Sequence, residues 1–301
     1  IFAARAVSSE GKIQVELAQL KYRASRLIGL GNSLSRLGGG IGTRGPGEKK
    51  LEMDRRLIRE RISRLKKELR EVEQHRELIR TQRKDSNLKV AALVGYTSAG
   101  KSSLENALTG AGILEDAMLF STLDTTTRAL ELEGKQQVLL TDTVGFIRKL
   151  PHHLIEAFKS TLEEAKYADI IIHVVDASNP QMDTQMYVVY DTLRQLGVEG
   201  KPIITLFNKQ DKLESLQMFR DLHADYTFAV SAKTGQGLDE LKGALLDIIR
   251  QDQIYVERLY DFSEAGKIQL IRKHGQLLEE KYVAEGIAVK AYVPKSIYGR
   301  I

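Results

Sequence analysis

Two stretches near the start of the chain repeat apolar residues every three or four positions, the spacing that places them on one face of a helix. The repeat in 10–28 comprises Ile13, Leu17, Leu20, Ala24 and Leu27, and the repeat in 48–84 comprises Leu51, Ile58, Ile62, Leu65, Leu69, Val72 and Ile79. The other positions are mostly charged, so each apolar stripe is as narrow as a coiled-coil seam. The pattern predicts an antiparallel hairpin whose second helix is about 55 Å long.

From residue 89 onward, short apolar runs alternate with helical patterns, which is typical of a mostly parallel sheet covered on both faces. The expected strands are 89–94, 128–133, 137–141, 169–175, 202–207 and 226–230, and the expected helices are 101–109, 152–166, 183–196, 212–222 and 237–250. The second and third strands are joined by Glu133-Gly134-Lys135-Gln136 and predict one antiparallel edge.

The last fifty residues predict a smaller unit, with a strand at 255–262, a helix at 263–274 and a hairpin of 277–283 with 287–293. We therefore expect three parts: 1–88 as the end of an N-terminal domain with the helical hairpin, 89–251 as an α/β domain, and 252–301 as a small α+β domain.

The composition of the 301 residues narrows the class of protein. The chain has no Cys, which excludes disulfides, thiol catalysis and thiolate metal sites and suits a reducing compartment. Its longest apolar runs have the length of strands, far short of a membrane span. We expect a monomeric cytoplasmic protein without a membrane partner, and the initial Ile1 suggests that an N-terminal region is missing.

Charge divides the chain at the same point as the pattern. Residues 1–88 carry 21 Lys and Arg against 11 Asp and Glu, whereas the remainder carries 24 against 29. A basic arm on an enzyme-like body and a solvated charged helix explain this equally well. Eight of the nineteen residues in 29–47 are Gly, and Arg36 and Arg44 lie among them, so this loop either docks on nucleic acid or serves as a linker.

The most specific motif is a phosphate-binding loop between the first strand and helix of the central part. It reads Gly95-Tyr96-Thr97-Ser98-Ala99-Gly100-Lys101-Ser102, followed by Ser103. The glycines allow successive N–H groups to face one point, where the helix N-terminus adds partial positive charge. Lys101 is expected to reach the terminal phosphates and Ser102 to offer its hydroxyl to Mg²⁺. The motif predicts that the chain binds a nucleoside triphosphate.

Asp142-Thr143-Val144-Gly145 follows the third strand and predicts the other half of this site. The Asp142 carboxylate is expected to hold Mg²⁺ through water, and Gly145 to offer its N–H to the γ-phosphate.

Two further segments select the base. Asn208-Lys209-Gln210-Asp211 and Ser231-Ala232-Lys233 each follow a predicted strand. The Asp211 carboxylate matches the N1–H and amine of guanine, Asn208 bridges the base and the phosphate loop, and the Lys209 stem covers the ring. A backbone N–H of 231–233 reaches the guanine O6, so GTP and GDP are the expected ligands.

Between the first helix and second strand, Phe120-Ser121-Thr122-Leu123-Asp124-Thr125-Thr126-Thr127-Arg128 occupies the place of a switch segment. A hydroxyl here is expected to complete the Mg²⁺ shell when the γ-phosphate is present, and four threonines compete for that role. Phe146 stands where many switch GTPases have the Gln that orients water. We therefore expect slow hydrolysis alone and activation by a partner.

With these residues in hand, the chain resembles the HflX family of ribosome-associated GTPases. The most specific stretch is Ser35-Arg36-Leu37-Gly38-Gly39-Gly40-Ile41-Gly42-Thr43-Arg44-Gly45-Pro46-Gly47-Glu48, supported by 12–20, 120–128 and 142–148. The resemblance implies a Ras-like P-loop GTPase domain and names Thr122 as the switch threonine, beside Lys101 and Gly145 in the catalytic set.

The same resemblance implies that the basic residues 1–88 bind the large ribosomal subunit, that ribosomes stimulate hydrolysis, and that some members split stalled ribosomes. The rival hypothesis is a GTP-gated RNA-binding or ribosome-binding module, or an RNA chaperone, with incidental hydrolysis. The chain departs from the family at Ser98, usually Asn and linked to a monovalent cation in related GTPases, and at Glu105, usually Phe. Lys49 and Met53 replace usual Thr residues, and no nucleotide ligand is lost.

Overall fold

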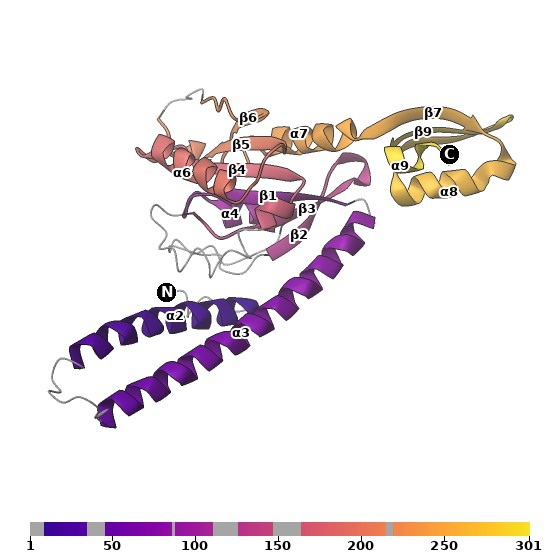
Figure 1. Ribbon diagram of the computed structural model, residues 1–301. Coiled ribbons are helices and arrows are strands. Elements are labelled where there is room, and N and C mark those ends of the chain that lie inside the picture. The colour runs from indigo at the N-terminus through magenta and orange to yellow at the C-terminus, as the bar shows by residue number, and fades with distance from the viewer. Residues whose placement is uncertain (1–8, 35–45, 86–87, 111–125, 147–163, 215–218) are drawn as a thin grey trace.

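The computed structural model describes residues 9–34, 46–85, 88–110, 126–146, 164–214 and 219–301. They form a helical hairpin, a central six-stranded sheet with its helices, and a smaller C-terminal sheet (Figure 1). None of the described helices contains a segment apolar and long enough to cross a lipid bilayer.

Helices α2 (Ser9–Leu34) and α3 (Pro46–Asp85) lie side by side as the predicted hairpin (Figure 1). They are antiparallel, because Arg61 pairs with Glu16 whereas Arg55 donates to the Leu27 carbonyl. The predicted seam is confirmed, with two fully buried residues, Leu17 and Leu65, and nine partly buried ones: Ile13, Leu20, Ala24, Leu27, Leu51, Ile58, Ile62, Leu69 and Val72. The side chain of Ile79 lies outside the described ones.

The first helix of the hairpin is longer than the sequence predicts. Residues 29–34 and 46–47 are helical, so the prediction of a loop over all of 29–47 is wrong at both ends. A glycine costs a helix only about 1 kcal/mol, and each added residue closes another backbone hydrogen bond, so a packed helix continues through isolated glycines. Arg36 and Arg44 lie outside the described residues.

The central sheet has the strand order β2-β3-β1-β4-β5-β6, and only the β2–β3 pair is antiparallel. Its strands are β1 (Lys89–Gly95), β2 (Thr126–Glu131), β3 (Gln137–Asp142), β4 (Ile170–Asp176), β5 (Ile203–Asn208) and β6 (Tyr226–Ala229). All six predicted strands are confirmed, although β2 begins two residues earlier than expected.

Each face of the sheet has its own core. Leu93 of β1 packs in a cluster with residues of α4 (Lys101–Thr109) and α7 (Leu238–Gln251). The next residue, Val94, packs on the opposite face with residues of α6 (Met182–Gln195). Alternate side chains of a buried strand therefore anchor helices on both faces, as expected of a doubly wound sheet. The predicted helix 152–166 lies mostly outside the described residues, of which 164–167 are helical.

The predicted helix at 212–222 is wrong in the part that the structure describes. A short 3-10 turn, η2 (Gln210–Lys212), is followed by extended and turn residues, and 219–222 are not helical. Phe219 stacks on Phe207 with ring centroids 4.8 Å apart. The Asp221 carboxylate accepts from the His223 N–H, which closes a local turn. Long-range packing and this turn override the helical spacing of the apolar residues.

The C-terminal unit is an antiparallel sheet of order β7-β9-β8 with a helix against it (Figure 1). Its elements are β7 (Gln253–Tyr260), η3 (Phe262–Glu264), α8 (Ala265–His274), β8 (Gln276–Val283), β9 (Gly286–Pro294) and α9 (Lys295–Tyr298). The predicted strand, helix and hairpin are confirmed, whereas α9 was not predicted.

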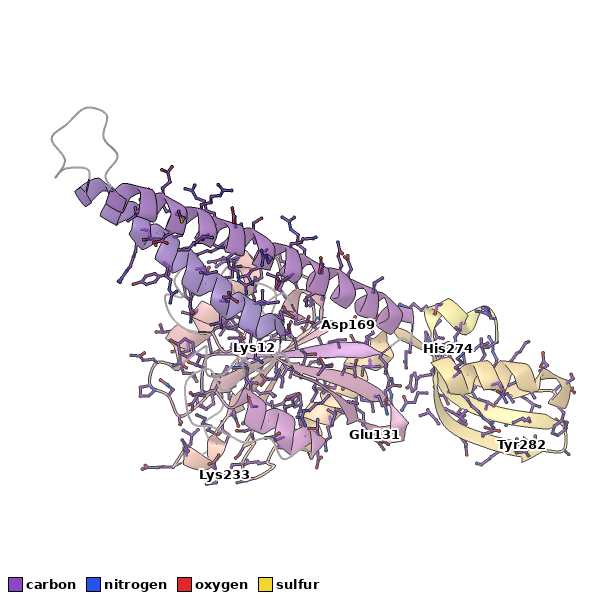
Figure 2. The ribbon with its side chains drawn as sticks, turned by 90° about the horizontal axis from the view of Figure 1, so that it is seen from below. Lys12, Glu131, Asp169, Lys233, His274 and Tyr282 are labelled. Carbon is purple, nitrogen blue, oxygen red and sulfur yellow. The ribbon has the colours of Figure 1, made fainter. Side chains whose placement is uncertain are left out.

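This C-terminal unit contacts the central domain through a few polar groups. The Gln276 Nε2 donates to the Glu133 carbonyl at 3.0 Å, in the turn η1 (Glu133–Lys135) between β2 and β3. Lys89, at the start of β1, forms an ion pair of 2.7 Å with Asp252. Figure 2 shows Glu131, beside this turn, at the side of the central domain that faces the C-terminal unit. The tip of the β2–β3 hairpin and the start of β1 thus both hold the C-terminal unit.

Replacing Gly134 by Ala is expected to disturb this docking. Gly134 has φ +71°, and an added Cβ would lie 2.3 Å from Gln276 Nε2. Gly197 has φ +70° with nothing within 4 Å of an added Cβ, so Gly197→Ala reports the backbone strain alone. We expect Gly197→Ala to cost about 1 kcal/mol and Gly134→Ala about 2 kcal/mol, since it also loses a hydrogen bond. Chemical denaturation of both variants measures this, and equal losses would contradict the docking role of Gln276.

Candidate functional site

The predicted phosphate loop turns tightly between β1 and α4. Gly95 and Gly100 have φ of +159° and +100°. An added Cβ at Gly95 would lie 2.3 Å from the Val174 carbonyl oxygen, and one at Gly100 would lie 2.3 Å from Asn208 Nδ2. Only glycine fits at both positions. Between them Tyr96 is partly buried, Thr97 and Ala99 are buried, and Ser98 is exposed with φ +62°.

Lys101 lies inside this loop. Its ammonium donates to the carbonyls of Gly95 and Tyr96, each at 3.3 Å, and only 6% of the residue is exposed. Burial lowers the pKa of Lys101, although the nearby carboxylate of Asp142 acts in the opposite direction. An enclosed ammonium held by neutral carbonyls gains strongly from an anion, so the loop favours phosphate.

Ser102 and Asp142 meet beside Lys101. The Ser102 hydroxyl donates to Asp142 Oδ2 at 2.8 Å, and Asp142 is buried at the carboxyl end of β3. Ser103, the next residue of α4, is partly buried. A carboxylate and a hydroxyl in contact are the oxygen ligands that sequence analysis assigned to a cation.

The segment after Asp142 is attached to the phosphate loop by its backbone. Thr97 N–H donates to the Phe146 carbonyl at 2.9 Å, and Phe146 N–H donates to the Gly95 carbonyl at 3.0 Å. An added Cβ at Gly145 would lie 2.9 Å from Thr97 Cα and 3.1 Å from Lys101 Nζ. The chain therefore needs glycine here to pass so close to the lysine.

The side chains around Gly145 point into the protein. Thr143 donates its hydroxyl to the Leu93 carbonyl at 2.7 Å, Val144 is buried, and Phe146 belongs to the core cluster with Val94. A contribution of Thr143 or Val144 to nucleotide binding would therefore come from their backbone. The Phe146 ring serves packing, a role that the sequence analysis missed.

The predicted base-selecting segments come together at the same edge of the sheet. Asn208 Nδ2 donates to the Ala99 carbonyl at 2.9 Å, while its Oδ1 accepts from Ala232 N–H at 3.0 Å. Asp211 accepts from the Ser231 hydroxyl at 2.7 Å and is exposed, as is Lys233, which Figure 2 shows away from the C-terminal unit. One amide thus joins the phosphate loop to the loop expected to contact guanine O6.

One residue of the site was missed by the sequence analysis. Asp176, the last residue of β4, accepts from Lys209 Nζ at 2.7 Å, and the same ammonium donates to the Ser98 carbonyl at 2.7 Å. No motif marks Asp176, although its place at the end of a central strand was a usable signal. The predicted switch residues Phe120, Ser121, Thr122, Leu123 and Asp124 lie outside the described residues.

Comparison with known proteins shows which family this chain belongs to. One family model, described as GTP-binding GTPase Middle Region, matches residues 5–83, and another, described as 50S ribosome-binding GTPase, matches 90–209. The chain is 65% identical over 301 residues to the GTPase HflX of Lacrimispora saccharolytica, with all of this chain and 71% of the relative covered. The chain belongs to the HflX family of GTPases.

Further relatives support the assignment to the HflX family. The GTPase HflX of Escherichia coli is 42% identical over 250 residues, covering 82% of this chain and 59% of that protein. A solved structure of a GTP-binding protein from Sulfolobus solfataricus in complex with GDP has a TM-score of 0.53 and 28% identity, and covers 83% of this chain and 70% of that one. The expected Ras-like P-loop fold is confirmed.

As a member of the HflX family, the chain binds and hydrolyses GTP. In this site, separate groups are placed for the two parts of the substrate, the phosphates and the base. Lys101 and the backbone of the loop from Gly95 are expected to bind the phosphates, while Asp211 is expected to bind the base and Asn208 to bridge the two. Because Asn208 contacts both loops, the distance between the phosphate and base sites is fixed before the nucleotide arrives.

Changing Asp211 to Asn is expected to change base selection. The amide replaces one acceptor by a donor, which no longer matches the two donors of guanine but matches xanthine, so GTP should bind about 100-fold more weakly while xanthosine triphosphate binds better. Competition binding with both nucleotides measures this. The control is Asp225→Asn, because Asp225 accepts from Ile203 N–H at the opposite end of β5. Unchanged GTP affinity in Asp211→Asn would contradict the guanine assignment.

A buried histidine behind the phosphate loop predicts acid sensitivity. His173 on β4 packs edge-on against the ring of Tyr190, whose hydroxyl donates to Asp221 at 2.5 Å. The Nδ1 atom of His173 has no hydrogen-bond partner among the described residues. Burial lowers its pKa from 6.5 to about 4, and Lys101 adds to the decrease while Asp221 opposes it. Between these values the unfolded chain binds a proton that the folded chain does not, so stability falls as the pH drops through that window.

We expect His173→Phe to remove this sensitivity. From pH 7 to pH 5 the original protein should lose about 2 kcal/mol more unfolding free energy than the variant. Chemical denaturation at both pH values measures the difference. The control is His223→Phe, whose exposed ring stands 5.1 Å from the Tyr190 ring. Identical pH dependence in the original protein and His173→Phe would show that another group is responsible.

Proposed function

We propose that this GTPase binds the large ribosomal subunit through the hairpin of α2 and α3, in the cytoplasm, and that its hydrolysis cycle serves ribosome splitting or rescue. The observation that carries the proposal is a basic stripe on α3 formed by Arg59, Lys66 and Arg70. All three are exposed, and none forms an ion pair within the described part of the chain. Their spacing of seven and four residues places them along one side of the helix.

The stripe suits a phosphate backbone because its side chains lie beside the apolar seam and take no part in the packing of α2 on α3. Two other basic residues of α3 are instead paired with carboxylates of the hairpin, Arg61 with Glu16 and Arg56 with Glu60. Unpaired Lys and Arg side chains on a rigid helix neutralise phosphates and release counterions, which gives nucleic-acid affinity with strong salt dependence. The description of the matching family model, 50S ribosome-binding GTPase, supports the large subunit as the partner.

We also propose Mg²⁺ as the cofactor, held by Ser102 and Asp142. The donor set fits, since Mg²⁺ takes oxygen ligands and is usually bound by one or two protein groups together with phosphate oxygens and water. Thr122 is the third ligand that the sequence analysis assigned. Bound there, the ion neutralises charge that develops on the β- and γ-phosphates. Lys101 and the N–H of Gly145 then hold the γ-phosphate.

The position of Phe146 favours activation by the partner. Its ring is 4% exposed and packs in the core, so it does not orient the attacking water. Hydrolysis therefore depends on groups outside the described residues or supplied by the ribosome. The same observation supports a second candidate function, a GTP-gated ribosome-binding module or RNA chaperone in which hydrolysis is incidental.

GTP turnover with and without purified large subunits distinguishes these functions. For a ribosome-activated enzyme we expect at least about tenfold stimulation, decreasing as salt is raised. Binding that requires GTP without any stimulation would favour the gated module. Absence of binding at low salt would contradict both.

Substituting Arg59, Lys66 and Arg70 by Ala tests the stripe itself. We expect weaker subunit binding and a log–log salt slope smaller by about 2, while GTP affinity is unchanged because the stripe lies outside the nucleotide site. The control replaces three exposed basic residues of the C-terminal unit, Lys273, Lys295 and Arg300, and changes the net charge equally. Equal weakening by both triple variants would show that overall charge, and not the stripe, determines binding.

A further inference from the structure

Asp176, at the end of β4, is linked through Lys209 to the segment after β5 and to the phosphate loop. Its Oδ2 accepts from Lys209 Nζ at 2.7 Å, and that ammonium also donates to the Ser98 carbonyl of the phosphate loop at 2.7 Å. The side chains of Asp176 and Lys209 are only 13% and 22% exposed. The lysine is therefore held between a carboxylate on β4 and a carbonyl on the phosphate loop, largely shielded from water.

The carboxylate of Asp176 is itself fixed in one orientation. Its Oδ1 accepts from the Ser178 hydroxyl at 2.6 Å and the Ser178 N–H at 3.0 Å. The next residue, Ala177, donates its N–H to the Asn208 carbonyl at 3.0 Å. Burial works against ionisation, yet the bonds from Lys209 and Ser178 keep the pKa of Asp176 below its ordinary value. The group is an anion with both oxygens occupied, Oδ1 by Ser178 and Oδ2 by the lysine.

This anchor acts on a strained part of the backbone. Lys209 and Ser98 have φ of +68° and +62° and are the residues other than glycine with positive φ among those described. Left-handed backbone costs such residues about 1 kcal/mol each. The shared ammonium links both positions, so a single ion pair offsets the strain on the two sides of the nucleotide site.

The consequence for recognition follows from the geometry of Lys209. Its aliphatic stem is fixed at the Cα by the left-handed conformation and at Nζ by Asp176 and Ser98. Asp211, the guanine-selecting carboxylate, stands two residues further on. Without the anchor, a hydrated flexible ammonium would have to be ordered each time a nucleotide binds, and that entropy would reduce affinity.

We propose that Asp176 is a positioning residue for guanine-nucleotide binding, acting through Lys209 to hold the base-covering stem and the phosphate loop in their binding geometry. The effect is uniform for GDP and GTP, because no part of this network reaches the γ-phosphate position beside Gly145. Asp176 therefore determines affinity and leaves the chemical step unaltered.

Asp176→Asn tests this proposal by removing the charge at nearly constant shape. We expect GDP and GTP to bind about tenfold more weakly and equally so, with KM raised and kcat at saturating GTP within about twofold of the original. The matched control is Asp252→Asn, which removes the carboxylate from another lysine pair of 2.7 Å, with Lys89, far from the nucleotide. Unchanged affinity in Asp176→Asn, or a loss confined to kcat, would overturn the proposal.

A double-variant cycle shows whether the effect passes through Lys209. Once Lys209→Met has removed the ammonium, adding Asp176→Asn should weaken GDP binding no further, whereas independent roles would make the two losses multiply. If Asp176→Asn does not fold, Ser178→Ala decides the matter, since it leaves the ion pair and removes a bond that orients the carboxylate. It should weaken both nucleotides about threefold, and full affinity in this variant would overturn the proposal.

Discussion

The buried ammonium of Lys101 is the constraint on which the rest of this structure depends. Removing a charged ammonium from water costs free energy, and hydrogen bonds to two neutral carbonyls offset little of that cost. The loop therefore favours binding of the negatively charged phosphates. To bring carbonyls, N–H groups and the lysine to one point, the backbone must pass through conformations and approaches that only glycine allows at positions 95, 100 and 145. The tight loop is therefore a consequence of enclosing one positive charge.

A loop of that kind holds its shape only when neighbouring strands support it. Phe146, four residues beyond the end of β3, binds Gly95 and Thr97 through two backbone hydrogen bonds. Asn208 at the end of β5 and Asp176 at the end of β4, the latter through Lys209, hold the opposite side. Three parallel strands thus converge on the loop that follows a fourth. The phosphate and base sites are consequently parts of one rigid edge of the sheet.

Sequence alone predicted the features that depend on local chemistry. The phosphate loop and α4 were placed correctly because glycine, lysine and serine at fixed offsets mark that turn in the sequence itself. The seam between α2 and α3 was predictable for a similar reason, since spacing fixes which face is apolar. The contacts of Asn208 with Ala99 and Ala232 were expected only in outline, because the motif names the residue and not its hydrogen bonds.

Most of the failures arise where contacts between residues distant in sequence decide the structure. Asp176 is 33 residues from Lys209, and no pattern in β4 distinguishes its carboxylate from an ordinary strand end. In the described residues of 212–222 the expected helix is absent, because Phe219 stacks on Phe207 and a turn forms at Asp221. Glycines that suggested a loop after residue 28 lie inside a helix, because an isolated glycine costs a helix only about 1 kcal/mol.

The arrangement also separates binding of GTP from its hydrolysis. The residues expected to bind base and phosphates lie at one edge of the sheet, whereas Phe146, which follows Gly145, turns its ring into the core and cannot orient the attacking water. The β2–β3 hairpin that leads into this segment is held at its tip by Gln276 of the C-terminal unit and, on β2, by an ion pair of 3.8 Å between Arg128 and the buried Glu105 of α4. Polar contacts therefore hold the β2–β3 hairpin at its tip and along β2, which fits the proposal that the activating group comes from a partner.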